Sequence, residues 1–260
     1  MDNSYGFAEL QEQLLIIMDD IDRICRAHDI PYTLSDGTLL GAVREKGFIP
    51  WDDDMDIRML RDDFEKFKPI YEKEKREDFI IGHPCNLASY SVINPGYVNP
   101  DMPKDKGMVV NPWVSIFPMD NAPQNEKQAR RKASVLRLLS GMMGKPPQYP
   151  AFSDKTKRMW NVASALGKIV GHKRAGKWYN AICIKDNKQK TGLYSCYAFN
   201  TKGAYRRFKQ YIFDTVQDMN FEDRVYLGIV HYHDYLSQEY GNDYMIPVPL
   251  EQRKSRHRVG

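Results

Sequence analysis

The stretch GFIPWDDDMDI, residues 47 to 57, places four carboxylates within five positions: Asp52, Asp53, Asp54 and Asp56. Apolar and aromatic side chains frame these acids on both sides, which is unusual for a solvated surface turn. Two like charges about 4 Å apart repel by about 4 kcal/mol at an effective dielectric constant of about 20. Because a divalent cation offsets this repulsion, the stretch predicts a metal-binding site.

Residues 51–60, WDDDMDIRML, are expected to form a strand, on which alternate side chains share a face. One face would then carry Asp52, Asp54, Asp56 and Arg58, while Asp53 would point toward the core. Mg²⁺ takes oxygen ligands and commonly uses one or two carboxylates together with substrate phosphates. The pair Asp54 and Asp56 therefore predicts a site for Mg²⁺ or Mn²⁺, with Asp53 in a structural role.

Three other interpretations of the acids fit less well. An EF-hand calcium loop starting at Asp52 would need Gly and Glu at the positions that hold Ile57 and Asp63. A solvated acidic turn would not continue into alternating Met and Ile, and helix capping would use one Asp rather than four.

The segment upstream supplies a second half to this site. IPYTLSD is expected to form a short strand, Gly37 and Thr38 a turn, and residues 38–47 a short helix. Backbone N–H groups at a helix start bind phosphate, and Arg44 would add a charge-assisted contact. A strand, a Gly-Thr turn, a helix and a strand with Asp-x-Asp are typical of polymerase-beta-like nucleotidyltransferases. The expected fold class is therefore α/β with a mixed sheet.

The whole chain has the balance of a globular protein, with 260 residues, 42% hydrophobic, 28% charged and a net charge of +4. The sequence contains no apolar run long enough to cross a bilayer, and its first residues lack the features of a secretion signal. The four scattered cysteines favour neither a zinc site nor a disulfide framework. We expect a cytoplasmic protein with one domain over 1–260 and a basic helical insertion at 124–180.

Charge is concentrated in that insertion. From Lys127 to Lys177 thirteen Lys or Arg face a single acid, Asp154, so this segment carries +12 and the remainder about −8. Such a segment predicts peripheral contact with an anionic membrane at its inner face, through residues 127–177, and we expect no nucleic-acid partner. The alternative is a packed pair of helices with a solvated basic face. Apolar residues recur here at helical spacing, namely Val135, Leu138, Leu139 and Met142.

Hydrophobic periodicity predicts the other elements. Helices are expected at 7–28, 61–77, 126–143, about 155–180 and 231–241, and strands at 193–200 and 221–228. Residues 79–123, rich in Pro, Asn and Gly, are expected to form strands and long loops.

Three blocks of the chain resemble one known family. They are DGTLLGAVREKGFIPWDDDMDI, WVSIFPMD, and FED with the later HDYLSQEYGNDYMIPVPLEQRKSRH. These blocks are similar to the LicD family, which includes the fukutin-related proteins. The resemblance implies a nucleotidyltransferase-like fold that transfers a phosphorylated alcohol rather than a nucleotide. Bacterial members move phosphocholine from CDP-choline to a cell-surface glycan of lipopolysaccharide, teichoic acid or capsule type, and animal relatives move ribitol phosphate from CDP-ribitol.

The resemblance also implies roles for residues far from the acidic stretch. Glu222 would reach the site or form a structural salt bridge, and His257 would contact phosphate unless it is inert in the tail. Two positions depart from the family, which usually has His where this chain has Glu45 and often Asp where it has Ser115. A third carboxylate would therefore come from Asp52 or Asp120.

Two aromatic residues flank the expected site. Trp51 and Tyr32 would stack a cytosine or enclose a quaternary ammonium, unless they serve in core packing.

The expected reaction follows from these groups. A cation on Asp54 and Asp56 would bridge the pyrophosphate of a CDP-alcohol, while Asp52 or Asp120 would accept the proton of the acceptor hydroxyl. CMP would leave, and the acceptor glycan would be free or lipid-linked. The alternatives are transfer of another alcohol phosphate, nucleotidyl transfer from a nucleoside triphosphate, and a catalytically silent metal-binding scaffold.

Overall fold

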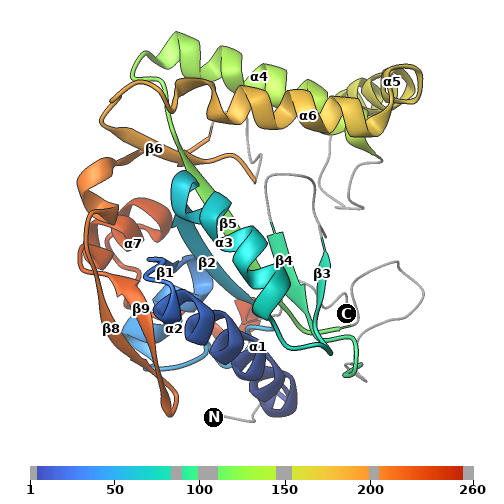
Figure 1. Ribbon diagram of the computed structural model, residues 1–260. Helices are drawn as coiled ribbons and strands as arrows, with labels where there is room; N and C mark the ends of the chain where they lie inside the picture. The colour runs from blue at the N-terminus through green and yellow to red at the C-terminus, as the bar shows by residue number, and fades with distance from the viewer. Residues whose placement is uncertain (1–4, 83–89, 99–110, 145–153, 199–204, 254–260) are drawn as a thin grey trace. The chain divides into compact units, whose positions relative to one another are not determined.

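The computed structural model describes residues 5–82, 90–98, 111–144, 154–198 and 205–253 (Figure 1). The chain divides into two compact units. The described residues of the first unit are 5–82, 90–98, 111–117 and 210–253, and those of the second are 118–144, 154–198 and 205–209. Helices and a sheet occur together, so the α/β class expected from the sequence is confirmed at this level.

The elements of the first unit are α1 (Ala8–Ala27), β1 (Thr33–Leu34), α2 (Asp36–Arg44), β2 (Met55–Leu60), α3 (Arg61–Glu74), β3 (Ile80–Gly82), β4 (Tyr90–Ile93), β5 (Trp113–Asn121), β8 (Val216–Phe221), β9 (Arg224–Ile229) and α7 (Tyr232–Tyr240). Short 3-10 helices follow at Gln210–Phe213 and Leu250–Gln252. Strand β5 continues into the second unit after Phe117.

Apolar spacing explains the first helix. Leu10, Leu14, Ile17, Ile21 and Ile24 recur at three and four residues and are all buried, as the sequence predicts for one face of a helix. Helix α1 contacts α3, and both lie in front of the sheet in Figure 1.

The sheet of the first unit has the order β1-β2-β5-β4-β3. Strand β1 pairs antiparallel with β2, and Leu34 lies opposite Ile57. Strand β4 pairs antiparallel with β5, and Ser91 lies opposite Ser115. Eight of the nine residues of β5 are buried, which makes it a central strand of the core.

Two predicted strands have different bounds in the structure. The strand expected at 51–60 begins only at Met55, so Asp52, Asp53 and Asp54 precede it. The strand expected at 221–228 corresponds to β9, which begins only at Arg224; it pairs antiparallel with β8, which the sequence analysis did not predict, across a turn at Glu222 and Asp223. Glu222 has a φ of 54°, a left-handed backbone conformation that ends one strand and starts the next.

The second unit contains α4 (Glu126–Met143), α5 (Asp154–Val170), α6 (His172–Cys183), β6 (Leu193–Cys196) and β7 (Phe208–Lys209), and its core includes Ala133, Leu136, Ala163, Tyr179 and Tyr197. Strand β6 pairs antiparallel with the end of β5 and with β7. The helix expected at about 155–180 is two helices, because the chain turns at Gly171, whose φ is 93°. In the described residues, none of the helices is long and apolar enough to span a membrane.

Candidate functional site

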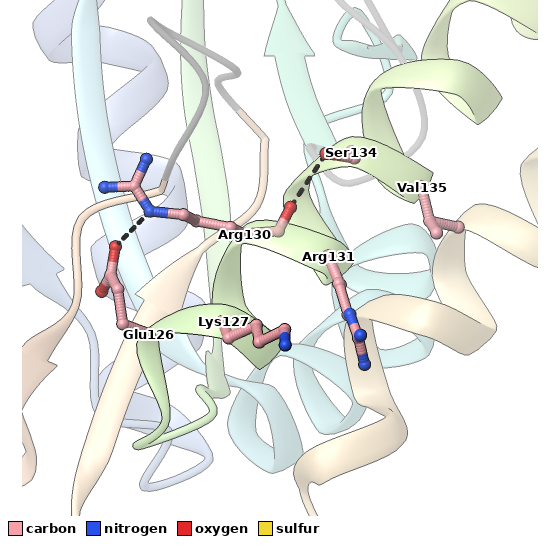
Figure 2. Close-up of a pocket in the computed structure, with 6 residues that line it drawn as sticks. All are labelled: Glu126, Lys127, Arg130, Arg131, Ser134 and Val135. Carbon is pink, nitrogen blue, oxygen red and sulfur yellow. Dashed lines mark hydrogen bonds and ion pairs between the residues drawn. The ribbon is translucent and has the colours of Figure 1, made fainter.

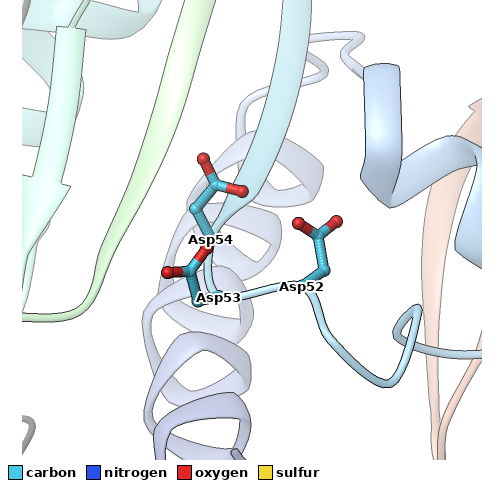
Figure 3. A group of neighbouring side chains, drawn as sticks. All are labelled: Asp52, Asp53 and Asp54. Atoms are coloured by element: carbon cyan, nitrogen blue, oxygen red, sulfur yellow. The ribbon is translucent and has the colours of Figure 1, made fainter. Parts of the chain in front are cut away.

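The acids of the opening stretch come together just before β2. Carboxylate oxygens of Asp52, Asp53 and Asp54 all lie within 4.8 Å of one another (Figure 3). Asp53 is only 1% exposed, whereas Asp52 and Asp54 are partly exposed. The prediction that Asp53 points inward is therefore confirmed, but its carboxylate still belongs to the group. Strand alternation does not separate these three residues because none of them is in the strand.

Gly37 brings this group against the first turn of α2. A Cβ atom at residue 37 would lie 2.6 Å from Oδ2 of Asp52, so only glycine leaves room for the carboxylate. The backbone of Asp52 is fixed as well, because its carbonyl accepts a hydrogen bond of 3.1 Å from Nε2 of the buried Gln11. Gly37 and Thr38 lie inside the helix rather than in a separate turn before it.

Asp56 follows on β2 and is electrostatically linked to the group. Burial raises the pKa of its carboxyl well above the usual value, and the neighbouring Asp54, Asp36 and Asp52 raise it further. Arg58 acts in the opposite direction, but its effect is smaller. The carboxylates around Asp56 thus carry more negative charge than the protein itself balances, as expected of residues that bind a cation.

Asp36 is a component that the sequence interpretation missed. Its carboxylate accepts hydrogen bonds of 2.9 and 3.0 Å from the guanidinium of Arg58 and one of 3.0 Å from the hydroxyl of Tyr235. The Tyr235 hydroxyl also accepts a hydrogen bond of 3.3 Å from the Asp36 amide. Asp36 has a φ of 48°, and such strained backbone is concentrated at functional sites. The sequence feature that could have identified Asp36 is its position directly before Gly37, but the expected strand IPYTLSD ends at Asp36.

Two hydroxyl groups lie at the start of α2. The Thr38 hydroxyl accepts a hydrogen bond of 2.9 Å from the Asp56 amide, which ties the helix to β2. Ser35 precedes the helix and is 1% exposed, and its Oγ makes no hydrogen bond to any described residue. A buried hydroxyl without a partner is costly, so the helix start retains capacity for a polar ligand.

Glu222 holds the loop between α2 and β2. Its Oε1 accepts a hydrogen bond of 3.1 Å from the Phe48 amide, and its own amide donates one of 2.7 Å to the Lys46 carbonyl. A Cβ on Gly47 would overlap the Glu222 carboxylate, so the backbone of this loop is in close contact with the β8–β9 turn. Glu222 therefore contacts the backbone that leads to the acids.

Arg44 has partners within the first unit. Its Nε lies 2.7 Å from Oε1 of Glu45, and Nη1 donates a hydrogen bond of 3.2 Å to the Tyr244 carbonyl. Glu45, the position at which this chain departs from the family pattern, thus balances the charge that was expected to bind a pyrophosphate.

The two aromatic candidates differ. Tyr32 is 2% exposed, and its hydroxyl donates a hydrogen bond of 2.6 Å to Asp22 and accepts one from the Leu227 amide. The expected stacking role of Tyr32 is wrong, because a buried ring has no free face for a ligand. Trp51 is partly exposed, but its ring already contacts Tyr5 and the guanidinium of Arg253, at centroid distances of 5.6 and 5.1 Å.

The remaining candidates lie elsewhere. Asp120 belongs to the second unit, where it is buried and accepts a hydrogen bond of 2.7 Å from Nδ2 of Asn187. Ser115 is buried on β5 and offers a hydroxyl rather than a carboxylate. His257 lies outside the described residues.

The donor set suits a hard cation. Asp52, Asp53 and Asp54 bring together carboxylate oxygens, which Mg²⁺ and Mn²⁺ prefer, and Asp56 lies close enough for Asp54 and Asp52 to raise its pKa. Gly37 lets the Asp52 carboxylate lie directly against the first turn of α2. The residues present therefore fit a divalent cation next to a phosphate.

Comparison with known proteins matches residues 29–128 to the LicD/FKTN/FKRP nucleotidyltransferase domain. The chain is also similar to the lipopolysaccharide cholinephosphotransferase LicD of Haemophilus influenzae, with 28% identity that covers 95% of this chain and 96% of that protein. Both matches support the resemblance to the LicD family that the sequence predicts. An uncharacterised protein of Rickettsia typhi is 39% identical over 67 residues, which cover 26% of this chain and 22% of the relative.

The LicD domain match contains most of the geometry described above. It includes Gly37, the acids from Asp52 to Asp56, and Asp120, but it ends before Glu222 and Tyr235. The alignment with the Haemophilus LicD protein extends the similarity over nearly the whole chain. Glu222 and Tyr235, which support α2 and the loop after it, therefore lie outside the matched domain, in a part of the chain where the similarity is to the Haemophilus LicD protein.

Proposed function

We propose that this chain is a metal-dependent phosphotransferase that moves phosphocholine from CDP-choline to a hydroxyl of a cell-surface glycan and releases CMP. The observation that carries the proposal is the packing of the acidic group against Gly37 at the start of α2. The similarity to a lipopolysaccharide cholinephosphotransferase supports choline as the alcohol and a lipopolysaccharide-type glycan as the acceptor. The first unit would then have a polymerase-beta-like nucleotidyltransferase fold, and the enzyme would act in the cytoplasm.

The proposed reaction breaks one phosphorus–oxygen bond and forms another. An acceptor hydroxyl oxygen attacks the phosphorus that bears choline, and the bond from that phosphorus to the CMP oxygen breaks with its electron pair on CMP. The acceptor hydroxyl loses its proton to a carboxylate of the first unit, for which Asp52 is our candidate. In phosphoryl transfer the protein mainly positions the groups and balances their charge.

Residues of the first unit divide these tasks. Asp54 and Asp56 would hold the cation, with Asp52 and Asp53 within reach of Asp54. When bound, Mg²⁺ supplies neutralisation of the pyrophosphate charge. The first turn of α2, with Gly37 and the Ser35 hydroxyl, would donate hydrogen bonds to phosphate oxygens.

CMP release from CDP-choline tests the proposal, with Mg²⁺ and a glycan acceptor present. We expect Asp54→Asn to lower the rate at least about a hundredfold, because it removes charge from the cation site. Asp62→Asn, an exposed acid at the start of α3, is the matched control and should keep full activity. Pyrophosphate release from ATP would point instead to nucleotidyl transfer. Absence of both products, with unchanged properties in Asp54→Asn, would leave only a silent scaffold.

A further inference from the structure

Helix α5 of the second unit has an apolar stripe on its exposed side. Met159, Val162, Leu166 and Ile169 are 55%, 62%, 43% and 83% exposed. They follow one another at three, four and three residues, so they lie along one face of the helix. Four large apolar side chains in one exposed line usually mark a binding surface.

A neighbouring face of α5 is fixed on α4. Ala163 is 3% exposed, and a Cβ on Gly141 of α4 would lie 2.6 Å from its Cβ. A Cβ on Gly167 would overlap the Met142 carbonyl oxygen, so the two backbones pass in close contact. Rotation of α5 would force larger side chains into this contact, and the apolar stripe therefore stays exposed.

Basic side chains are exposed on both α4 and α5. Arg130 pairs with Glu126 on α4, whereas the nearby Lys127 and Arg131 form no ion pair within the described part of the chain (Figure 2). These side chains line an open pocket of about 810 Å³. On α5, Arg158 is exposed and comes four residues before Val162, which places it beside the stripe. The segment 127–177 as a whole carries +12.

We propose that the exposed face of α5 docks on the surface of an anionic lipid bilayer. The four apolar side chains would enter the boundary of the acyl chains, and exposed basic side chains of the segment, Arg158 among them, would pair with headgroup phosphates. Charge decides between this surface and a second copy of the chain, because a second copy would bring another +12 segment against the first. Of the four α4 positions that recur at helical spacing in the sequence, Val135 and Leu138 are 42% and 49% exposed, whereas Leu139 and Met142 are buried.

Vesicle sedimentation of the full chain tests this proposal. We expect binding to vesicles of phosphatidylcholine with phosphatidylglycerol and none to phosphatidylcholine alone. The double variant Val162→Asp/Ile169→Asp should lower the partition coefficient between vesicles and water at least about tenfold, because the burial of two apolar side chains in the bilayer is lost. Ile246→Asp is the matched control, since Ile246 is 71% exposed in the first unit, and it should bind like the wild type.

Three results would overturn the proposal: no vesicle binding by the wild type, unchanged binding by the double variant, or a wild-type dimer that the double variant loses. Circular dichroism checks that the double variant is folded. If it is unfolded, the variant Val162→Ser/Ile169→Ser takes its place, and this variant should also bind vesicles more weakly than the wild type. CMP release in solution is measured separately, since membrane docking and phosphotransfer are independent properties of this chain.

Discussion

The carboxylate of Asp52 lies where a side chain at position 37 would otherwise be. We therefore expect Gly37→Ala to displace Asp52 and to lower CMP release at least about tenfold, since small errors in position are costly in catalysis. Stability should change little, because Ala is favoured over Gly inside a helix by about 1 kcal/mol, which offsets part of the clash. Activity assays and thermal melting of the variant measure both effects.

Gly144→Ala is the control for this substitution, since a Cβ there would meet no described atom within 4 Å. Full activity in Gly37→Ala would show that the position of Asp52 does not matter for turnover.

Asp56 should make the stability of the metal-free protein depend on pH. Its pKa is raised by burial and by neighbouring acids, so the folded state holds the proton more tightly than the unfolded state. Stability in EDTA is then highest at low pH and falls as the pH rises from about 4 through the raised pKa. At neutral pH, Asp56→Asn should melt at a higher temperature than the wild type. This difference in melting temperature should shrink as the pH is lowered and should stop changing below about pH 4.

Melting curves over a pH series in EDTA measure this difference. With Mg²⁺ added, the wild type should gain stability and Asp56→Asn should gain less. A variant that melts below the wild type by the same amount at every pH would contradict this account of Asp56.

At the residue scale, the sequence identified the acidic stretch and Gly37 but not how they meet. The role of Asp53 was assigned by strand alternation, which fails because the strand begins at Met55. Asp36 was missed because its importance depends on Tyr235, which is 199 positions later in the chain. Such long-range partners leave no local signal in one sequence.

At the scale of elements, α2 depends on a side chain from α7. The Tyr235 hydroxyl donates to the Asp36 carboxylate and accepts from the Asp36 amide. We expect Tyr235→Phe to lower the free energy of unfolding by about 1–3 kcal/mol, since it leaves buried polar groups unpaired. Urea denaturation measures this loss, and CMP release should fall in parallel because the start of α2 is loosened.

Tyr211→Phe is the control for Tyr235→Phe. The Tyr211 ring is 41% exposed, and its hydroxyl donates to Asp234, so water can replace that hydrogen bond. Equal losses in the two variants would show that the bond to Asp36 has no special role.

Long helices were predicted best. The helix α4 has the predicted bounds, and α1 differs by one residue at each end, because apolar spacing over many turns is a strong signal. In the hairpin β8–β9, the turn and β9 were predicted as one strand and β8 was missed, since the turn at Glu222 and Asp223 contains neither Gly nor Pro. The sharp reversal of the hairpin depends on the left-handed backbone conformation of Glu222, and Glu is not a residue type that predicts this conformation.

At the scale of the whole molecule, ligand binding should stabilise the native chain. Mg²⁺ with CDP-choline at about a hundred times the dissociation constant would add about 2.7 kcal/mol. We therefore expect a clear rise in melting temperature that is larger than the rise with Mg²⁺ alone, and we expect Asp54→Asn to abolish it. A rise with ATP instead of CDP-choline would contradict the proposed donor.

Three contacts of α2 and its loop have consequences for protein synthesis. Phe48, Asp36 and Arg44 are held by residues that follow 174, 199 and 200 positions later. Because translation proceeds from the N-terminus, these supports leave the ribosome long after the residues that they hold. A nascent chain halted before Glu222 would hold its acidic segment without them, and we expect it to bind no cation. Such a chain would thus be unable to consume the donor, and activity would appear only after residue 244 has been made.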